Sequence, residues 1–227
     1  MGQGTQLRDG KRRTRVVVTR AAAQAGPLVS RLETLGLEVV VCPLVEIVPL
    51  GDDPIDPSPY DWVIVTSPNG ADELARRLAS APARIAAIGP GTAAALRAHG
   101  LEPVLVPAVS TQEGLLAELP RPAGRVLVAA AEGARRLLVD ELDADFLPLY
   151  RTVELRPPEP PEGDLAVVAS ASAARALAAT GARMPVVAIG PQTAAVARKA
   201  GLAVAAEAET HDLDGLVAAV ARAAERT

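Results

Sequence analysis

The chain has 227 residues, of which 49% are hydrophobic, and its formal net charge is −4. A chain of this length and hydrophobic content can fill the cores of one or two domains. The negative charge and an aromatic content of only 2% argue against a general nucleic-acid-binding protein. There is no run of about 20 apolar residues that would span a membrane.

The chain begins with a basic segment, residues 1–13, that lacks the apolar core of a secretory signal. We therefore expect a disordered leader and a cytoplasmic protein. The single cysteine, Cys42, cannot form an internal disulfide, and we expect it to be a buried, inert thiol. His99 and His211 are the only histidines, so the chain lacks a recognisable zinc or iron–sulfur site, and we expect no metal or cofactor.

Short β-branched runs alternate with Ala- and Leu-rich stretches along the whole chain, which is typical of parallel strands joined by crossover helices. Two proline-rich stretches, residues 48–59 and 155–163, interrupt this alternation and are predicted to be extended, fairly stiff connectors. Strands are predicted near residues 15–19, 37–41, 62–66, 84–88, 103–106, 125–129, 146–149, 165–169, 186–189 and 203–206, with helices between most of them.

The sequence also repeats itself. The segment Ile85–Ala94 reads IAAIGPGTAA, and Val186–Ala195 reads VVAIGPQTAA. Around these turns, Asp61–Leu74 resembles Asp164–Leu177, and Arg15–Thr19 resembles Arg125–Ala129 more weakly. We conclude that one unit of about 100 residues, a common size for a single domain, is used twice.

The repeats allow two domain arrangements. Consecutive domains would meet near residues 120–124, which form a short and unexceptional loop. If the proline-rich stretches are instead the crossings, residues 50–152 form one domain, and residues 1–49 and 153–227 together form the other. We favour this discontinuous arrangement because it explains why the longest connectors lie inside the repeats. Two such crossings side by side would leave a hinged cleft between the domains.

Two Gly-Pro-x-Thr turns each follow a predicted strand and begin a helix. Open parallel sheets bind ligands beyond the carboxyl ends of their strands, which is where these turns lie. Gly89 and Gly190 permit a close backbone approach, and the free N–H groups of a helix start suit a carboxylate or phosphate. The alternative is that Thr92 and Thr193 simply cap their helices.

Further polar side chains follow other predicted strands. Ser67 and Asn69 in one repeat, and Ser170 and Ser172 in the other, are candidate ligand donors, although helix capping alone would also explain them. Arg20 places a guanidinium at another strand end, where a solvated arginine is the simpler alternative.

Tyr150 ends a predicted strand just before the second connector. Its hydroxyl could donate a proton there, but packing in a half-buried site is the commoner role of a tyrosine. The chain contains no nucleophile elbow, Walker loop or HExxH helix, and the glycine turns lack the full GxGxxG pattern. We therefore do not expect catalysis by a dedicated nucleophile or a metal.

Together these motifs resemble the uroporphyrinogen-III synthase family, and the match covers nearly the whole chain. Their order and spacing are more specific than any single motif. The matching segments are Val17–Arg20 with Gln24, Leu35–Leu37, Cys42–Glu46, Asp61–Ser67 with Asn69 and Gly70, both Ile-Gly-Pro turns, Leu149–Thr152 and His211–Leu216.

The resemblance implies an α/β fold of two flavodoxin-like, doubly wound parallel-sheet domains with a two-stranded connector and an interdomain cleft. It implies that a polyanionic linear tetrapyrrole, hydroxymethylbilane, loses water and closes to uroporphyrinogen III with inversion of ring D. A monomer is expected, with neither nucleic acid nor membrane as a partner. The rival hypothesis is a hinged two-domain protein that binds or senses a small ligand without catalysis.

The resemblance also assigns roles to residues. Tyr150 matches the tyrosine that assists departure of the hydroxyl group, as general acid or hydrogen-bond donor. The serines, threonines and Asn69 would hold substrate carboxylates, together with the turn backbones. Many relatives have a proline between the two serines of the second serine motif, whereas this chain has Ala171, which affects the expected pose of Ser172.

Overall fold

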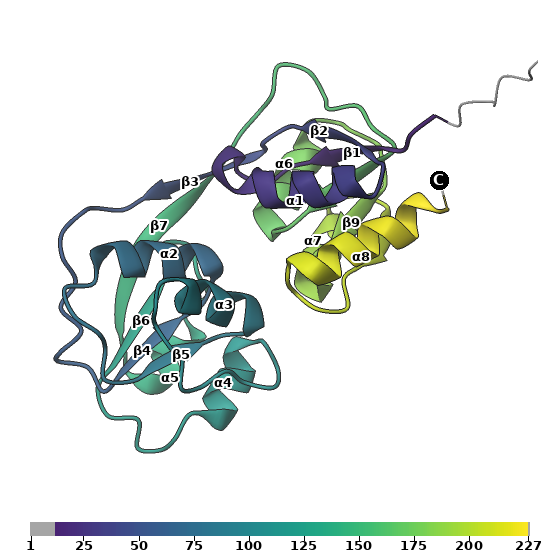
Figure 1. Cartoon of the computed structure of the whole chain (residues 1–227). Coiled ribbons are helices and arrows are strands. Elements are labelled where there is room, and N and C mark those ends of the chain that lie inside the picture. The colour runs from purple at the N-terminus through teal and green to yellow at the C-terminus, as the bar shows by residue number, and fades with distance from the viewer. Residues whose placement is uncertain (1–11, 227) are drawn as a thin grey trace, which may run out of the picture. The chain divides into compact units, whose positions relative to one another are not determined.

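The computed structural model describes residues 12–226 (Figure 1), so the expected leader lies almost wholly outside the described residues. The chain divides into two compact units. Unit 1 contains the described residues up to Leu44, then Arg156–Glu209, then the chain from Asp214 onward. Unit 2 contains Val45–Leu155 and Thr210–Leu213.

Unit 1 is built on a five-stranded sheet in the order β10-β9-β8-β1-β2, in which every paired strand is parallel. With the strands renumbered along unit 1, this is the doubly wound 2-1-3-4-5 order of flavodoxin-like sheets. The strands are β1 (Arg15–Val18), β2 (Glu38–Val41), β8 (Leu165–Val168), β9 (Val186–Ala188) and β10 (Val204–Glu207), and the helices are α1 (Ala22–Thr34), α6 (Ala171–Ala179), α7 (Pro191–Lys199) and α8 (Leu213–Ala224).

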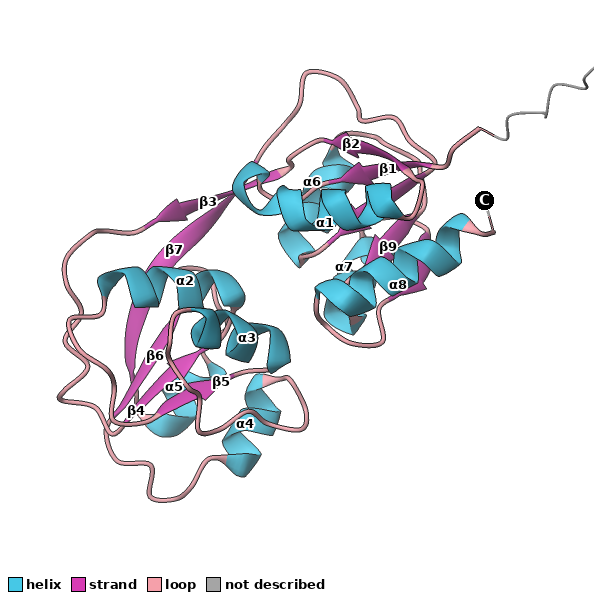
Figure 2. Cartoon of the chain, in the orientation of Figure 1, coloured by secondary structure: helices cyan, strands magenta, loops and turns pink. Residues whose placement is uncertain are grey.

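Helices cover both faces of this sheet, with α1 and α8 on the near side in Figure 2 and α6 and α7 behind. The central strand β8 is buried along its whole length, as expected when both faces of a parallel sheet are covered. Alternate side chains serve opposite faces. Val17, Ala166 and Val168 pack with the buried side of α6 and α7, including Leu177 and Ala194.

Unit 2 contains a second five-stranded sheet, in the order β3-β7-β6-β4-β5. Four strands run parallel, and β3 pairs with β7 in the antiparallel direction. The strands are β3 (Val45–Pro49), β4 (Trp62–Val65), β5 (Ile85–Ala87), β6 (Val126–Ala131) and β7 (Asp145–Glu154), and the helices are α2 (Pro68–Arg77), α3 (Pro90–Ala98), α4 (Gln112–Glu118) and α5 (Leu137–Leu142).

The edge strands of unit 2 differ from the sequence prediction. The antiparallel strand β3 is not among the predicted strands, and it belongs to the sheet of unit 2. The predicted strand at 103–106 is reduced to one isolated bridge between Ala86 and Leu105. Pro103 has no N–H to donate, and Val104 is 64% exposed, so little holds a longer strand at this edge.

The sequence repeat is also a repeat of sheet positions. The order β9-β8-β1-β2 in unit 1 matches β5-β4-β6-β7 in unit 2, and the bridge at Leu105 occupies the place of β10. The predicted α/β class with two doubly wound, mainly parallel sheets is therefore confirmed. The expected domain boundaries, and a cleft between domains, stay predictions.

Candidate functional site

Helix α2 begins at the carboxyl end of β4, which lies between β6 and β5 in the sheet of unit 2. Ser67 is its N-cap in extended conformation, and its Oγ accepts a hydrogen bond from the backbone N–H of Gly70 at 3.0 Å. Pro68 follows at the first helical position, where the absence of an N–H has no cost. The capping role predicted for Ser67 is confirmed, whereas Asn69 lies inside the first turn and is not the cap.

Tyr150 lies on β7 and is only 5% exposed. Its ring belongs to a core cluster with Val65 and Ala129, and its hydroxyl lies 2.9 Å from Ser67 Oγ. The Asn69 side chain also hydrogen bonds to this hydroxyl. Burial raises the pKa of Tyr150 above 10.0, and the bonds to Ser67 and Asn69 partly oppose that rise. The phenol is therefore protonated at neutral pH.

The first Gly-Pro-x-Thr turn begins helix α3 after the neighbouring strand β5. Gly89 is the N-cap, no side chain caps the helix, and Thr92 is the third helical residue with 3% of its surface exposed. The hypothesis that Thr92 caps this helix is therefore wrong. A Cβ at Gly89 would lie 2.6 Å from Ser110 Oγ, so only glycine leaves room for Ser110 here.

Ser110 was not predicted as a site residue from the sequence. It lies in the loop before α4, whose N-cap is Thr111, and it is brought against Gly89 by the fold. The pattern around Thr111 predicts a helix start, but nothing in the sequence indicates which turn the preceding serine contacts.

Unit 1 repeats the same two helix starts. Ser170 is the N-cap of α6 and accepts from Ala173 N at 3.1 Å, which confirms its predicted capping role. Ser172 lies within the helix, and its Oγ accepts from the Arg175 guanidinium at 3.1 Å. Helix α7 starts at Gly190 without a side-chain cap, and Thr193, 7% exposed, is again the third helical residue rather than the cap.

Arg20 follows β1 at the carboxyl edge of the sheet in unit 1. The preceding residue, Thr19, is fully buried and donates its hydroxyl to the carbonyl of Val167 at 2.6 Å, which fixes the chain at this edge. Arg20 itself is half-buried, and its burial lowers its pKa. Among residues 12–226 no hydrogen bond or ion pair to its guanidinium is found. A partly desolvated cation without a counter-charge favours binding of an anion.

The predicted site residues thus form one group in each unit. In unit 2, Ser67, Asn69 and Tyr150 are joined by hydrogen bonds, and the turn of α3 follows the adjacent strand. In unit 1 the predicted residues follow three adjacent strands, β1, β8 and β9. Each unit therefore presents polar groups and helix N-termini at the carboxyl edge of its own sheet, as ligand sites in open α/β sheets require.

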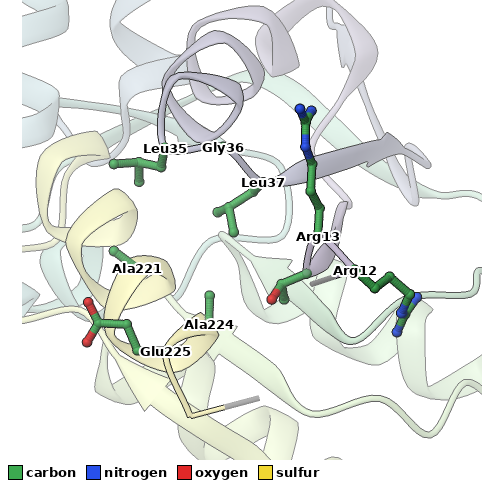
Figure 3. A pocket seen from close by; sticks show the side chains of 9 residues that line it. Arg12, Arg13, Leu35, Gly36, Leu37, Ala221, Ala224 and Glu225 are labelled. Carbon is green, nitrogen blue, oxygen red and sulfur yellow. The ribbon is translucent and has the colours of Figure 1, made fainter. Parts of the chain in front are cut away.

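A pocket of about 350 Å³ lies elsewhere on unit 1 (Figure 3). Its lining includes Arg12, Arg13, Leu35, Leu37 and the end of α8. Arg12 and Arg13 precede β1, and Leu35 and Leu37 lie just before β2, so the pocket is at the amino ends of these strands and contains none of the predicted site residues.

Other functional classes receive no support from the described chain. Cys42 is half-buried, and burial raises the pKa of its thiol, so it is a poor nucleophile. No group of three or more His, Cys, Asp or Glu side chains arranged to hold a metal occurs in residues 12–226. Within the same range, no helix is both long and apolar enough to cross a bilayer.

Comparison with known proteins gives a consistent family. A family model described as uroporphyrinogen-III synthase HemD matches residues 26–218. A putative uroporphyrinogen-III synthase of Methanocaldococcus jannaschii is 31% identical over 150 residues, which span 62% of each chain. The uroporphyrinogen-III synthase of Synechococcus elongatus is 25% identical, and the alignment spans 93% of this chain and 96% of that one.

A solved structure shows the same fold. The crystal structure of a mutant uroporphyrinogen III synthase from the extremely thermophilic bacterium Thermus thermophilus matches 94% of this chain and 100% of that one, with a TM-score of 0.64 at 20% identity. At this identity the likeness supports the architecture of two α/β sheets and does not carry residue roles.

Proposed function

The chain belongs to the uroporphyrinogen-III synthase family, and we propose that it closes hydroxymethylbilane to uroporphyrinogen III, with inversion of ring D and loss of water. The observation that supports this most is the hydrogen-bonded group of Tyr150, Ser67 and Asn69 at the carboxyl edge of unit 2. It supplies a protonated, partly desolvated donor on a rigid strand.

In the proposed reaction, Tyr150 acts as general acid. As the carbon–oxygen bond of the hydroxymethyl group breaks, the phenol gives its proton to the departing oxygen, which leaves as water. The electron-poor methylene carbon left behind is attacked by the terminal pyrrole ring, and a spirocyclic intermediate allows that ring to invert. Ring closure releases one proton, which returns the phenolate to a phenol, so the net change is the loss of one water.

Substrate carboxylates are proposed to bind at the helix starts and at Arg20. The N-termini of α3 and α7 begin at glycines without a side-chain cap, so their first N–H groups are available to an anion. Arg20 adds a guanidinium, which suits a carboxylate because it can donate two parallel hydrogen bonds. Ser170 and Ser172 extend this binding surface in unit 1.

Holding the substrate at several dispersed points would also select the product. The free substrate closes without inversion, so the enzyme must favour the geometry in which the substituted carbon of ring D is attacked first. Several oriented contacts to a flexible polyanion restrict it to that geometry, and such restriction can account for a large share of a rate enhancement.

Three further proposals complete this function. The reaction is proposed to need no cofactor, because proton transfer and positioning balance it. We also propose a monomer in the cytoplasm, where a protein with a single cysteine and no internal disulfide is at home. Light scattering after gel filtration measures the oligomeric state, and a mass twice that of the chain would contradict the proposed monomer.

The decisive test supplies hydroxymethylbilane to the purified chain, oxidises the products and separates the porphyrin isomers. We expect isomer III to form much faster than isomer I does in an enzyme-free control. Formation of isomer I alone, at the spontaneous rate, would contradict the proposal. Binding of the substrate without acceleration would instead indicate a hinged binding protein.

A further inference from the structure

The Ser67 hydroxyl has one proton to donate and two lone pairs to accept with. The backbone N–H of Gly70 donates to one lone pair at 3.0 Å. The Tyr150 hydroxyl, at 2.9 Å, either receives the Ser67 proton or donates to the second lone pair. These two arrangements have opposite consequences, because only the first leaves the phenol proton free.

The phenolic oxygen of Tyr150 can itself accept hydrogen bonds while its own proton points elsewhere. Two side chains, Ser67 and Asn69, bond to this hydroxyl. If both donate, the acceptor capacity of the oxygen is used within unit 2, and the phenol proton is left for a ligand. If either accepts, that proton is held by the protein and cannot reach a substrate.

We infer that Ser67 and Asn69 are positioning residues that act through Tyr150, by donating hydrogen bonds to its phenolic oxygen so that the phenol proton faces the substrate. This inference rests on the proposed function, in which Tyr150 gives up that proton. It differs from direct binding of substrate carboxylates by Ser67 and Asn69, which is what the family resemblance implies for them.

The surroundings of Tyr150 make such donors necessary. Tyr150 belongs to the buried cluster that also contains Val65, Ala129 and Leu149, so a phenolate formed there without partners would be costly. Two preorganised donors stabilise charge as it develops on the oxygen. The bonds from Ser67 and Asn69 act against burial and lower the pKa of Tyr150, which is the direction that helps a proton donor.

Unit 1 contains a matched control for the capping role. Ser170 caps α6 as Ser67 caps α2, with a bond of 3.1 Å from Ala173 N. Both tyrosines of the chain, Tyr60 and Tyr150, lie in unit 2, so no phenol in unit 1 depends on Ser170. A loss at Ser170, through weaker capping or weaker substrate binding, is independent of Tyr150, whereas a loss transmitted through Tyr150 is specific to Ser67.

The test is a double-mutant cycle with Ser67→Gly and Tyr150→Phe. Glycine is tolerated at an N-cap, so Ser67→Gly removes the hydroxyl while keeping the helix start. We expect Ser67→Gly to lower kcat about tenfold, as for loss of one bond to a developing charge, and to leave KM within about twofold. In the Tyr150→Phe background, the same change should have no further effect, and Ser67→Thr should restore most of the activity.

Asn69→Ala tests independently whether Asn69 positions the Tyr150 hydroxyl. We expect this variant also to lower kcat rather than to raise KM. If the losses of kcat multiply in the Ser67→Gly/Tyr150→Phe double variant, or if Ser67→Gly raises KM and leaves kcat unchanged, Ser67 binds the substrate directly. Ser170→Gly is the control variant. Any fold-reduction in kcat that it causes should multiply with the fold-reduction caused by Tyr150→Phe.

A spectroscopic readout separates this inference from the proposed function. The chain has two tyrosines, so Tyr60→Phe leaves Tyr150 as the sole source of the tyrosinate absorbance. In that background Ser67→Gly should raise the titration midpoint of Tyr150, and an unchanged or lowered midpoint would overturn the inference. If the wild-type chain forms only isomer I, the proposed function fails; if it forms isomer III and the cycle is multiplicative, only the inference fails.

Discussion

The two units share a backbone plan but carry different chemical groups at matching places. Cys42-Pro-Leu-Val45 in the first repeat corresponds to Leu147-Pro-Leu-Tyr150 in the second, so the tyrosine is matched in sequence by Val45, where the chain leaves unit 1 and begins β3. Conversely, the alignment of β1 with β6 places Arg20 opposite Ala130. One copy has gained a proton donor and the other a cation.

Features common to both copies are those that shape a general anion site. Each unit has one helix capped by a serine, Ser67 or Ser170, and one that begins at an uncapped glycine, Gly89 or Gly190. We infer that the uncapped glycine turns supply binding in both units, that Tyr150 supplies the chemistry in unit 2, and that Arg20 adds a further binding group in unit 1. The predictions below test that division, beginning with the residue expected to matter most.

Replacing Tyr150 by Phe should remove the chemistry of unit 2 while keeping its packing. We expect kcat to fall at least about tenfold, which corresponds to roughly 1.4 kcal/mol of barrier. Steady-state assay of isomer III measures this effect. An unchanged kcat would reject a necessary role for the hydroxyl and leave Tyr150 as a core residue only.

Removing the cation of unit 1 by Arg20→Gln should weaken substrate binding. We expect KM to rise about tenfold, as for the loss of one charge-assisted hydrogen bond, with a smaller change in kcat. Thermal stability should rise slightly, because a half-buried cation without a counter-charge is removed. Arg20→Lys is the control and should recover part of the affinity; a KM equal to that of the wild type in Arg20→Gln would show that the guanidinium does not touch substrate.

The two Gly-Pro-x-Thr turns should respond alike. Thr92→Val and Thr193→Val each keep the side-chain shape and remove a hydroxyl, so each should raise KM about threefold, as for one neutral hydrogen bond. The double variant should show the product of the two effects. A rise in KM for only one of the two variants would contradict the proposal that both turns bind substrate.

The helix caps are expected to affect stability rather than substrate binding. Ser170→Ala should lower the free energy of unfolding by about 1 kcal/mol through loss of the cap of α6. Ser67→Ala should cost about 1 kcal/mol more, because it also removes a partner from the buried Tyr150 hydroxyl. Urea denaturation measures both, and equal losses would show that the Ser67–Tyr150 bond adds nothing to stability.

Much of the fold could be predicted from the sequence because its signals are local. Apolar runs such as Leu165–Val168 mark buried parallel strands, and a serine or glycine after such a run marks a helix start. The errors occurred at sheet edges. Residues 45–49 end in a proline and were partly absorbed into a connector, yet pairing with β7 makes them a strand. Residues 103–106 have the composition of a strand but find only one bridge.

The candidate site was predicted as separate residues and not as a connected group. Ser67 and Asn69 could be named because they follow a strand, and Tyr150 because it ends the predicted strand 146–149. That strand end was wrong, since β7 continues past Tyr150 to Glu154, where it pairs with β3. The mutual hydrogen bonds of these three residues depend on the register of β6 with β7, including the irregularity that places Tyr150 opposite Ala131. Ser110 was missed for the same reason, since its contact with Gly89 arises from the path of a loop rather than from any pattern.

The antiparallel pairing of β3 with β7 has a consequence for how the chain folds. Val45 pairs with Glu154, so a folded unit 2 returns the chain beside the point where it entered. In unit 1, β1 pairs with β8, and Val16 lies beside Leu165. If β1 paired with β8 while unit 2 was still unfolded, the pairing would cost the closure entropy of a long loop. That cost grows with the logarithm of the loop length. The main segment of unit 2, Val45–Leu155, is continuous in sequence and is synthesised before β8. If this segment folds early, on the ribosome, its two ends lie side by side. The effective loop between β1 and β8 is then short when β8 pairs with β1.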